Sequence, residues 1–115
     1  ICGNSTALAE HCVIHSSLTA RAAMRHCVVC DCESVGIYVT DAAQGQFEDC
    51  EIARNSLAGI EVNIRANPFF RRCHVHDGGN TGIYTRNHGM GHFESCNIHN
   101  NESSGIEVRN AANPT

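Results

Sequence analysis

The fold is decided by residues 59–82, GIEVNIRANPFFRRCHVHDGGNTG, because the same pattern recurs along the chain every 23 residues. A glycine followed by an isoleucine stands at residues 36–37, 59–60, 82–83 and 105–106. A cysteine column has the same period: Cys27, Cys50, Cys73 and Cys96. Self-similarity at one strict period indicates a solenoid, in which each repeat buries its apolar face against its neighbours.

Each repeat has the chemistry of short strands. Apolar and polar residues alternate with period two in residues 59–63 and again in residues 73–75, so the apolar side chains are predicted to point inward. An aromatic column lies between these strands, formed by Phe47, Phe70 and Phe93 with Met24 at the same phase. Glycine, asparagine and aspartate fill the corners, as in residues 77–80 and 100–101, and we expect them to supply the positive φ angles of sharp turns.

These features predict an all-β fold, a right-handed parallel β-helix solenoid of about five turns of 23 residues. The chain is expected to be one part of a single β-helix domain, with a degenerate first turn at 1–26 and regular turns at 27–49, 50–72, 73–95 and 96–115. In the first turn, Val13-Ile14 is aligned with the Gly-Ile column and Asn4 with the cysteine column. A leucine-rich-repeat horseshoe is rejected, because its leucine pattern is missing.

The pattern Gly-Ile-x-Val, then Asn-Pro-x-Phe-x-x-Cys-x-Val-x-Asp-Gly, from Gly59 to Gly78, resembles the β-helix repeats (CASH-type) of F-box proteins that carry a right-handed β-helix. The resemblance covers about residues 27–115. It implies substrate recognition in a cullin-RING ubiquitin ligase. The family repeats carry asparagine in the corner column where this chain has Cys50, Cys73 and Cys96.

Composition narrows the classes of partner and the compartment. The net charge is −4 and the chain has no lysine, which argues against nucleic acid and anionic membranes as partners. The cysteine column reads as a reduced internal stack, which favours a cytoplasmic or nuclear protein. Two N-glycosylation triplets, at residues 4–6 and 101–103, favour secretion as the alternative. Since the chain starts without methionine, we expect it to be a fragment of a longer protein.

Catalysis is not expected from this segment. We expect its four aspartates, Asp31, Asp41, Asp49 and Asp77, to lie at different phases of the repeat, most of them in turns. An acid–base site needs such groups gathered on one face. No cofactor is expected. The alternative that stays open is a segment of a carbohydrate-active β-helix enzyme (a polysaccharide lyase, hydrolase or epimerase) with catalytic acids on other turns, and its ligand would be a glycan.

No metal site is predicted, although one patch has suitable ligands. His74 and His76 flank an inward valine, His99 follows His76 by one repeat, and Glu51 precedes His74 by one repeat. Zinc accepts such a ligand set in tetrahedral geometry. The competing interpretation is a polar outer face in a histidine-rich chain. Residues 26–32 resemble a metal knuckle, but Cys27 falls in the buried column.

The surface of the Gly-Ile strands is the predicted binding site. Its first outward column alternates tyrosine with glutamate, and its second outward column, two residues later, runs from Thr40 and Asn63 into two arginines. The predicted binding residues are Tyr38, Glu61, Tyr84, Glu107, Arg86 and Arg109. Tyrosine and arginine are enriched at binding hot spots, so we expect a protein partner on this face. Ordinary pairing between neighbouring turns is the alternative explanation.

Overall fold

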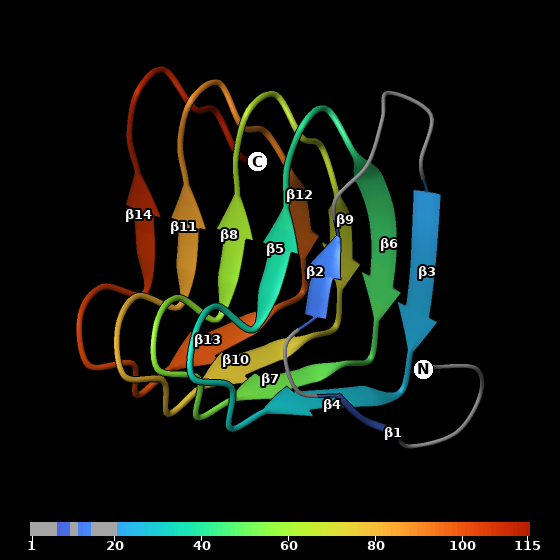
Figure 1. Cartoon of the computed structure of the whole chain (residues 1–115), viewed down its shortest axis with the longest axis vertical. Coiled ribbons are helices and arrows are strands. Elements are labelled where there is room, and N and C mark those ends of the chain that lie inside the picture. Colours follow the sequence, from blue (N-terminus) through green and yellow to red (C-terminus); the bar gives the residue numbers. More distant parts are fainter. Residues whose placement is uncertain (1–6, 10–11, 15–20) are drawn as a thin grey trace.

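The structure, a computed structural model, describes residues 7–9, 12–14 and 21–115, with side chains from residue 23 onward. In these ranges the chain forms only short strands, which coil into a solenoid (Figure 1). The strands are β1 (Ala7–Ala9), β2 (Cys12–Ile14), β3 (Arg21–Arg25), β4 (Cys27–Cys30), β5 (Ile37–Val39), β6 (Gln44–Glu48), β7 (Glu51–Ala53), β8 (Ile60–Val62), β9 (Phe69–Arg71), β10 (His74–His76), β11 (Ile83–Thr85), β12 (His92–Glu94), β13 (Asn97–His99) and β14 (Ile106–Val108). None of the described segments is a helix of the length and hydropathy that a membrane crossing requires.

The strands form three parallel sheets, one along each side of the solenoid. Sheet A contains β1, β4, β7, β10 and β13, sheet B contains β2, β5, β8, β11 and β14, and sheet C contains β3, β6, β9 and β12. Each turn passes from sheet A through sheet B to sheet C, which confirms the predicted parallel β-helix (Figure 1). The described chain completes about four turns rather than the predicted five. At the end of the chain, Thr115 hydrogen-bonds with Gly91 and Phe93 without forming a strand.

The register between turns follows the 23-residue period from β4 onward. Val28, Glu51 and His74 are paired in succession along sheet A. The first turn departs from this period, because Ile14 pairs with Val39 instead of the predicted Ile37. The alignment predicted for Val13-Ile14 is therefore wrong by two residues. The alignment predicted for Asn4 lies outside the described residues.

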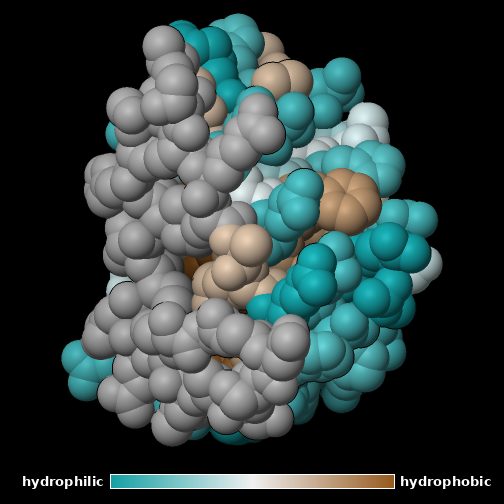
Figure 2. Space-filling model, turned by 90° about the vertical axis from the view of Figure 1, so that its right-hand side faces the viewer, coloured by the Kyte–Doolittle hydropathy of each residue, from teal (hydrophilic) through white to brown (hydrophobic). Residues whose placement is uncertain are grey.

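Columns of apolar side chains fill the interior. The isoleucines of the Gly-Ile column at 37, 60 and 83 are fully buried, as are Phe47 and Phe70. The rings of Phe47 and Phe70 stack with centroids 4.5 Å apart and an interplanar angle of 10°, and Phe93 continues the stack at 5.2 Å. The predicted aromatic column is confirmed, with Met24 paired to Phe47. Seen from the end that carries β3, the described residues that are visible are mainly hydrophilic, with smaller hydrophobic areas (Figure 2).

The corners follow the prediction in part. Asp77 and Asn100 have the predicted positive φ angles, but Gly78 and Gly79 do not, and Gly91 is the one glycine with a positive φ angle among the described residues. The other left-handed positions are occupied by side-chain-bearing residues that include arginines, histidines and the remaining three aspartates. The glycine column serves close approach. A Cβ on Gly59 would lie 2.6 Å from Val75 Cγ1 and 2.9 Å from the Gly82 carbonyl oxygen, so no larger residue fits there without displacement.

The cysteine column is only partly the reduced stack that was predicted. Cys50, Cys73 and Cys96 are free thiols, but Cys27 is disulfide-bonded, so the prediction is wrong for Cys27. Contacts with the Cys73 thiol lower the pKa of Cys50 to about 7 and that of Cys96 to about 6. The same contacts, together with burial, raise the pKa of Cys73. These thiols line one corner of the interior, where neighbouring turns bring them into hydrogen-bonding distance.

Candidate functional site

The outer face of sheet B carries the predicted column of alternating tyrosine and glutamate. Tyr38 is paired with Glu61, Glu61 with Tyr84, and Tyr84 with Glu107. Parallel strands in register place equivalent residues directly above one another, so the 23-residue period is sufficient to build this column. Glu61 is 8% exposed, whereas the other three side chains are half-buried.

Two arginines hold the two carboxylates of this column. Arg86 Nε donates to Glu61 Oε1 at 2.9 Å, and Arg109 Nε lies 2.6 Å from Glu107 Oε1. Burial on its own would lower the pKa of Arg86, but attraction to Glu61 outweighs burial and raises it. The guanidinium carbon of Arg86 also lies 5.5 Å from the centroid of the Tyr84 ring. The Arg86 side chain is thus fixed by a carboxylate and an aromatic face together.

The second outward column does not reach the surface along its whole length. Thr40 and Asn63 are 2% and 4% exposed, so the prediction that both side chains lie on the outer surface is wrong. Asn63 donates from Nδ2 to the Tyr38 hydroxyl at 2.9 Å and accepts at Oδ1 from Asn87 Nδ2 at 2.8 Å. Asn110 extends this chain of amides to the next turn. The sequence gives only a weak signal for this chain of amides, because Asn63 and Asn87 are separated by one residue more than the repeat length.

A hollow of about 300 Å³ opens beside the tyrosine–glutamate column. Four of the six predicted binding residues line it: Glu61, Tyr84, Glu107 and Arg109. The other lining residues come from the corner between sheets A and B: Val35, Leu57, Ala58, Asn80 and Thr81. Tyr38 and Arg86 are not among the residues that line it. The hollow, which we call the sheet B pocket, was not predicted, because its corner residues vary from turn to turn.

The patch of possible metal ligands, Glu51, His74, His76 and His99, is assembled on the outer face of sheet A, but its groups satisfy one another. His76 bonds through Nε2 to Glu51 Oε1 at 2.9 Å and through Nδ1 to Asp77 Oδ2 at 2.6 Å. The His76 ring stacks on that of His99 at 5.0 Å, and His74 meets both rings edge-on. Among the described residues, no group of three or more histidine, cysteine or acidic side chains is placed to hold a metal ion.

The protonation of His76 follows from its two carboxylate partners. Burial lowers its pKa, while the hydrogen bonds and charges of Asp77 and Glu51 raise it, and the net shift is upward. Asp77 was not predicted as a member of this patch. The signal was present in the sequence, because Asp77 directly follows His76 at a corner position.

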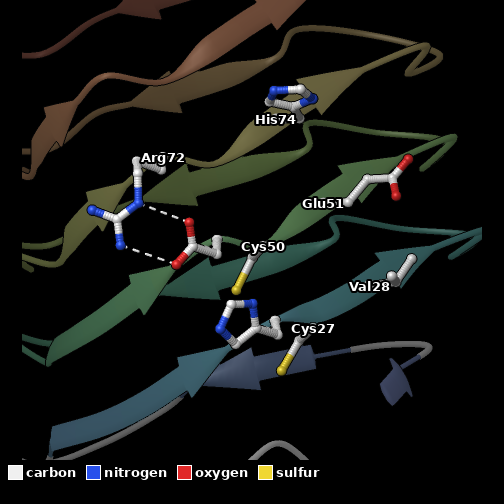
Figure 3. Close-up of a pocket in the computed structure, with 8 residues that line it drawn as sticks. Cys27, Val28, Cys50, Glu51, Arg72 and His74 are labelled. Atoms are coloured by element: carbon white, nitrogen blue, oxygen red, sulfur yellow. Dashed lines mark hydrogen bonds and ion pairs between the residues drawn. The ribbon is translucent and has the colours of Figure 1, made fainter. Parts of the chain in front are cut away.

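A second, more open hollow of about 500 Å³ lies at the corner between sheets C and A (Figure 3). Figure 3 shows Arg72 bridging to an aspartate on the neighbouring turn, with Glu51 and His74 farther along the strands. This aspartate is Asp49, whose Oδ1 and Oδ2 accept from Arg72 at 2.8 and 3.0 Å. The Arg72 guanidinium lowers the pKa of Asp49.

The four aspartates have structural positions. Each has a positive φ angle at a corner, where the short side chain tolerates the left-handed conformation. Asp31 is bonded to Arg54 in the same way as Asp49 is bonded to Arg72. Asp31 and Asp77 share the corner that follows a sheet A strand, two turns apart, so the prediction of different phases is wrong for this pair, whereas Asp41 and Asp49 lie at the other two corners. The knuckle-like residues 26–32 form no metal group, since Cys30 and Cys32 are buried and Cys27 is disulfide-bonded.

Comparison with known proteins agrees with this architecture. A family model described as a right handed beta helix region matches residues 11–115. The F-box protein dre-1 of Caenorhabditis elegans is 64% identical to the chain over 36 residues, which are 31% of this chain and 4% of that protein. The match thus spans a small part of the relative's length. No solved structure matches the chain.

Proposed function

Because the chain belongs to the family of right-handed β-helix regions, we propose that it is a recognition module that binds a protein partner on the outer face of sheet B. The single observation that carries this proposal is the tyrosine–glutamate column with a pocket beside it. A rigid solenoid wall presents side chains at fixed spacing, and such walls serve as extended docking surfaces. Tyrosine and arginine are enriched among the residues that contribute most of the binding energy at protein interfaces.

The finer proposal is that the partner is a substrate of a cullin-RING ubiquitin ligase. It is supported by the 36-residue match to a protein described as an F-box protein, and by the resemblance of residues 59–78 to CASH-type repeats. Such a role would place the chain in the cytoplasm or nucleus. The free thiols of Cys50, Cys73 and Cys96 fit that compartment, whereas the disulfide at Cys27 does not.

The test is affinity capture of the full chain from a reducing cell lysate, with bound proteins identified by mass spectrometry. Three forms are compared: the wild type, Tyr84→Ala on sheet B, and Gln46→Ala, an exposed position on sheet C. We expect at least one partner that the wild type and Gln46→Ala retain and that Tyr84→Ala loses. A partner set that is the same for all three forms would contradict binding through sheet B.

The ubiquitin-ligase role is tested separately on any partner that depends on Tyr84. Its ubiquitylated fraction should rise in cells that express the wild-type protein, and not in cells that express Tyr84→Ala. If a Tyr84-dependent partner is found but its ubiquitylation is unchanged, the recognition module stands and the ligase role is wrong. If no protein is captured and a polysaccharide array gives binding, the glycan alternative takes its place.

A further inference from the structure

We propose that the sheet B pocket receives one arginine side chain of the partner protein. This inference rests on the proposed function and adds the chemistry of the group that is recognised. The pocket combines an acidic end, an aromatic wall and an apolar corner, and the volume of about 300 Å³ lies at the lower limit of ligand sites. A cavity of that size accommodates one long side chain rather than an extended ligand.

The acidic end has unused hydrogen-bonding capacity. Glu61 and Glu107 both line the pocket, and Arg86, which neutralises Glu61, does not. Arg86 uses only Glu61 Oε1, and Glu61 Oε2 has no hydrogen-bond partner among the described residues. Because Glu61 is 8% exposed, its charge is weakly screened by water, and an incoming donor gains more there than at the surface.

The Glu107 carboxylate is oriented by two neighbouring side chains, Thr81 and Arg109. Thr81, which is buried, donates from Oγ1 to Glu107 Oε2 at 3.3 Å. The other oxygen of Glu107 is paired with Arg109, whose side chain is 64% exposed. An exposed pair of this kind contributes little, so a partner guanidinium can replace Arg109 at low cost.

The remaining walls match the rest of an arginine side chain. Tyr84 offers an aromatic surface, and it already stacks near the Arg86 guanidinium at 5.5 Å, which shows that the column tolerates this pairing. Val35, Leu57 and Ala58 form the apolar part of the lining, and Leu57 is 46% exposed. A methylene stem can pack against these groups while its charged head reaches Glu61. Arginine is favoured over lysine, because its planar fork binds a carboxylate and an aromatic face together.

The experiment is a titration of the full chain, labelled with nitrogen-15, with three capped pentapeptides. Each peptide has two alanines on either side of a central arginine, citrulline or glutamate. We expect the arginine peptide to shift the amide signals of Glu61 and Tyr84 with a Kd on the order of 1 mM, typical of one isolated side chain. Citrulline, which has the same shape without the charge, should bind at least about tenfold more weakly.

Two variants localise the effect. Glu61→Gln keeps an oxygen for Arg86 and should weaken arginine-peptide binding by about fivefold or more, because the pocket loses its unused carboxylate oxygen. Gln46→Ala should leave the affinity unchanged. Equal binding of the arginine and citrulline peptides, preference for the glutamate peptide, or an unaffected Glu61→Gln would each overturn the arginine proposal.

This result is separable from that of the capture experiment. If Tyr84→Ala loses a protein partner while the arginine peptide does not bind, sheet B is a docking face and the arginine proposal is wrong. If the arginine peptide binds and depends on Glu61, but no captured partner depends on Tyr84, the pocket chemistry stands and the recognition function fails.

Discussion

The outer faces of sheets A and B both pair carboxylates with cationic side chains, yet they do so with opposite consequences. On sheet B, Glu61 is held by Arg86, whose charge is constant across the physiological pH range. On sheet A, Glu51 and Asp77 are both held by His76, whose charge depends on pH. The two faces share one register and one core, so the identity of the cation decides how each behaves.

The two faces also differ in whether their polar groups already have hydrogen-bond partners. In the sheet B pocket, Glu61 keeps one oxygen without a partner, which leaves a place for a ligand group. In the sheet A patch, both ring nitrogens of His76 are occupied, and the rings of His74 and His99 pack around it. A cluster of ligating residue types therefore does not make a site when its members satisfy one another.

The largest expected effect concerns the core that both faces share. Phe70→Ala should destabilise the protein by about 3–5 kcal/mol, because it removes the middle ring of the Phe47–Phe70–Phe93 stack and leaves a cavity. Urea unfolding followed by circular dichroism measures the change. Tyr84→Ala, on the surface of sheet B, should leave the unfolding free energy nearly unaltered. A Phe70 variant as stable as the wild type would show that the proposed register is wrong.

A smaller effect should separate the two arginines of sheet B. Arg86→Met leaves the buried Glu61 carboxylate without its partner and should cost about 1–2 kcal/mol at neutral pH, less than a fully buried pair because Arg86 is partly exposed. Arg109→Met is the matched control, since Arg109 is mostly exposed, and its stability should stay close to that of the wild type. Equal losses for the two variants in thermal unfolding would remove the distinction between a buried and an exposed ion pair.

The pH dependence should distinguish sheet A from sheet B. Because the pKa of His76 is raised above its ordinary value of 6.5, its ion pairs contribute stability that is fully present below that pH. This contribution is lost as the pH rises through the raised pKa. In urea unfolding between pH 5.5 and 8.5, the stability difference between the wild type and His76→Gln should shrink as the pH rises, because both forms share the contribution of the other titrating groups. The groups that face His76 are Glu51, Asp77, His74 and His99.

The outcome for Arg86→Met serves as the reference for this pH experiment. Its pH profile should run parallel to that of the wild type, because His76 is intact in that variant. A His76→Gln profile that parallels the wild type would contradict the assignment of the pH dependence to sheet A.

The smallest effect is expected at the corner between sheets C and A. Asp49→Asn breaks the charge of the pair with Arg72 but retains a residue that tolerates a positive φ angle. Since the pair is exposed to solvent, no change in midpoint beyond experimental error is expected in urea unfolding. A clear loss of stability would mean that the corner ion pairs contribute more than their exposure indicates.

The inward columns and the tyrosine–glutamate column were predictable, because a strand alternates with period two and the repeat fixes which residues lie above one another. Ile60, Val62 and Phe70 are buried, and Tyr84 faces outward, as expected. Thr40 and Asn63 could not be predicted as buried. Their enclosure depends on the corner that follows each sheet B strand and on amides donated by a neighbouring turn, such as Asn87.

The sequence by itself determined the solenoid, the parallel sheets and the residues that share each column. The reason is that the 23-residue period can be read directly from the order of the residues. Only the tertiary structure decided how the corners close. Corners bring together residues from different turns, as at Gly59 and Val75, so their contacts follow from three-dimensional proximity. The sheet B pocket and the pairing of His76 with Glu51 on the preceding turn both depend on such contacts. The fold could therefore be predicted from the repeat, whereas the sheet B pocket depends on corner residues that differ from one repeat to the next.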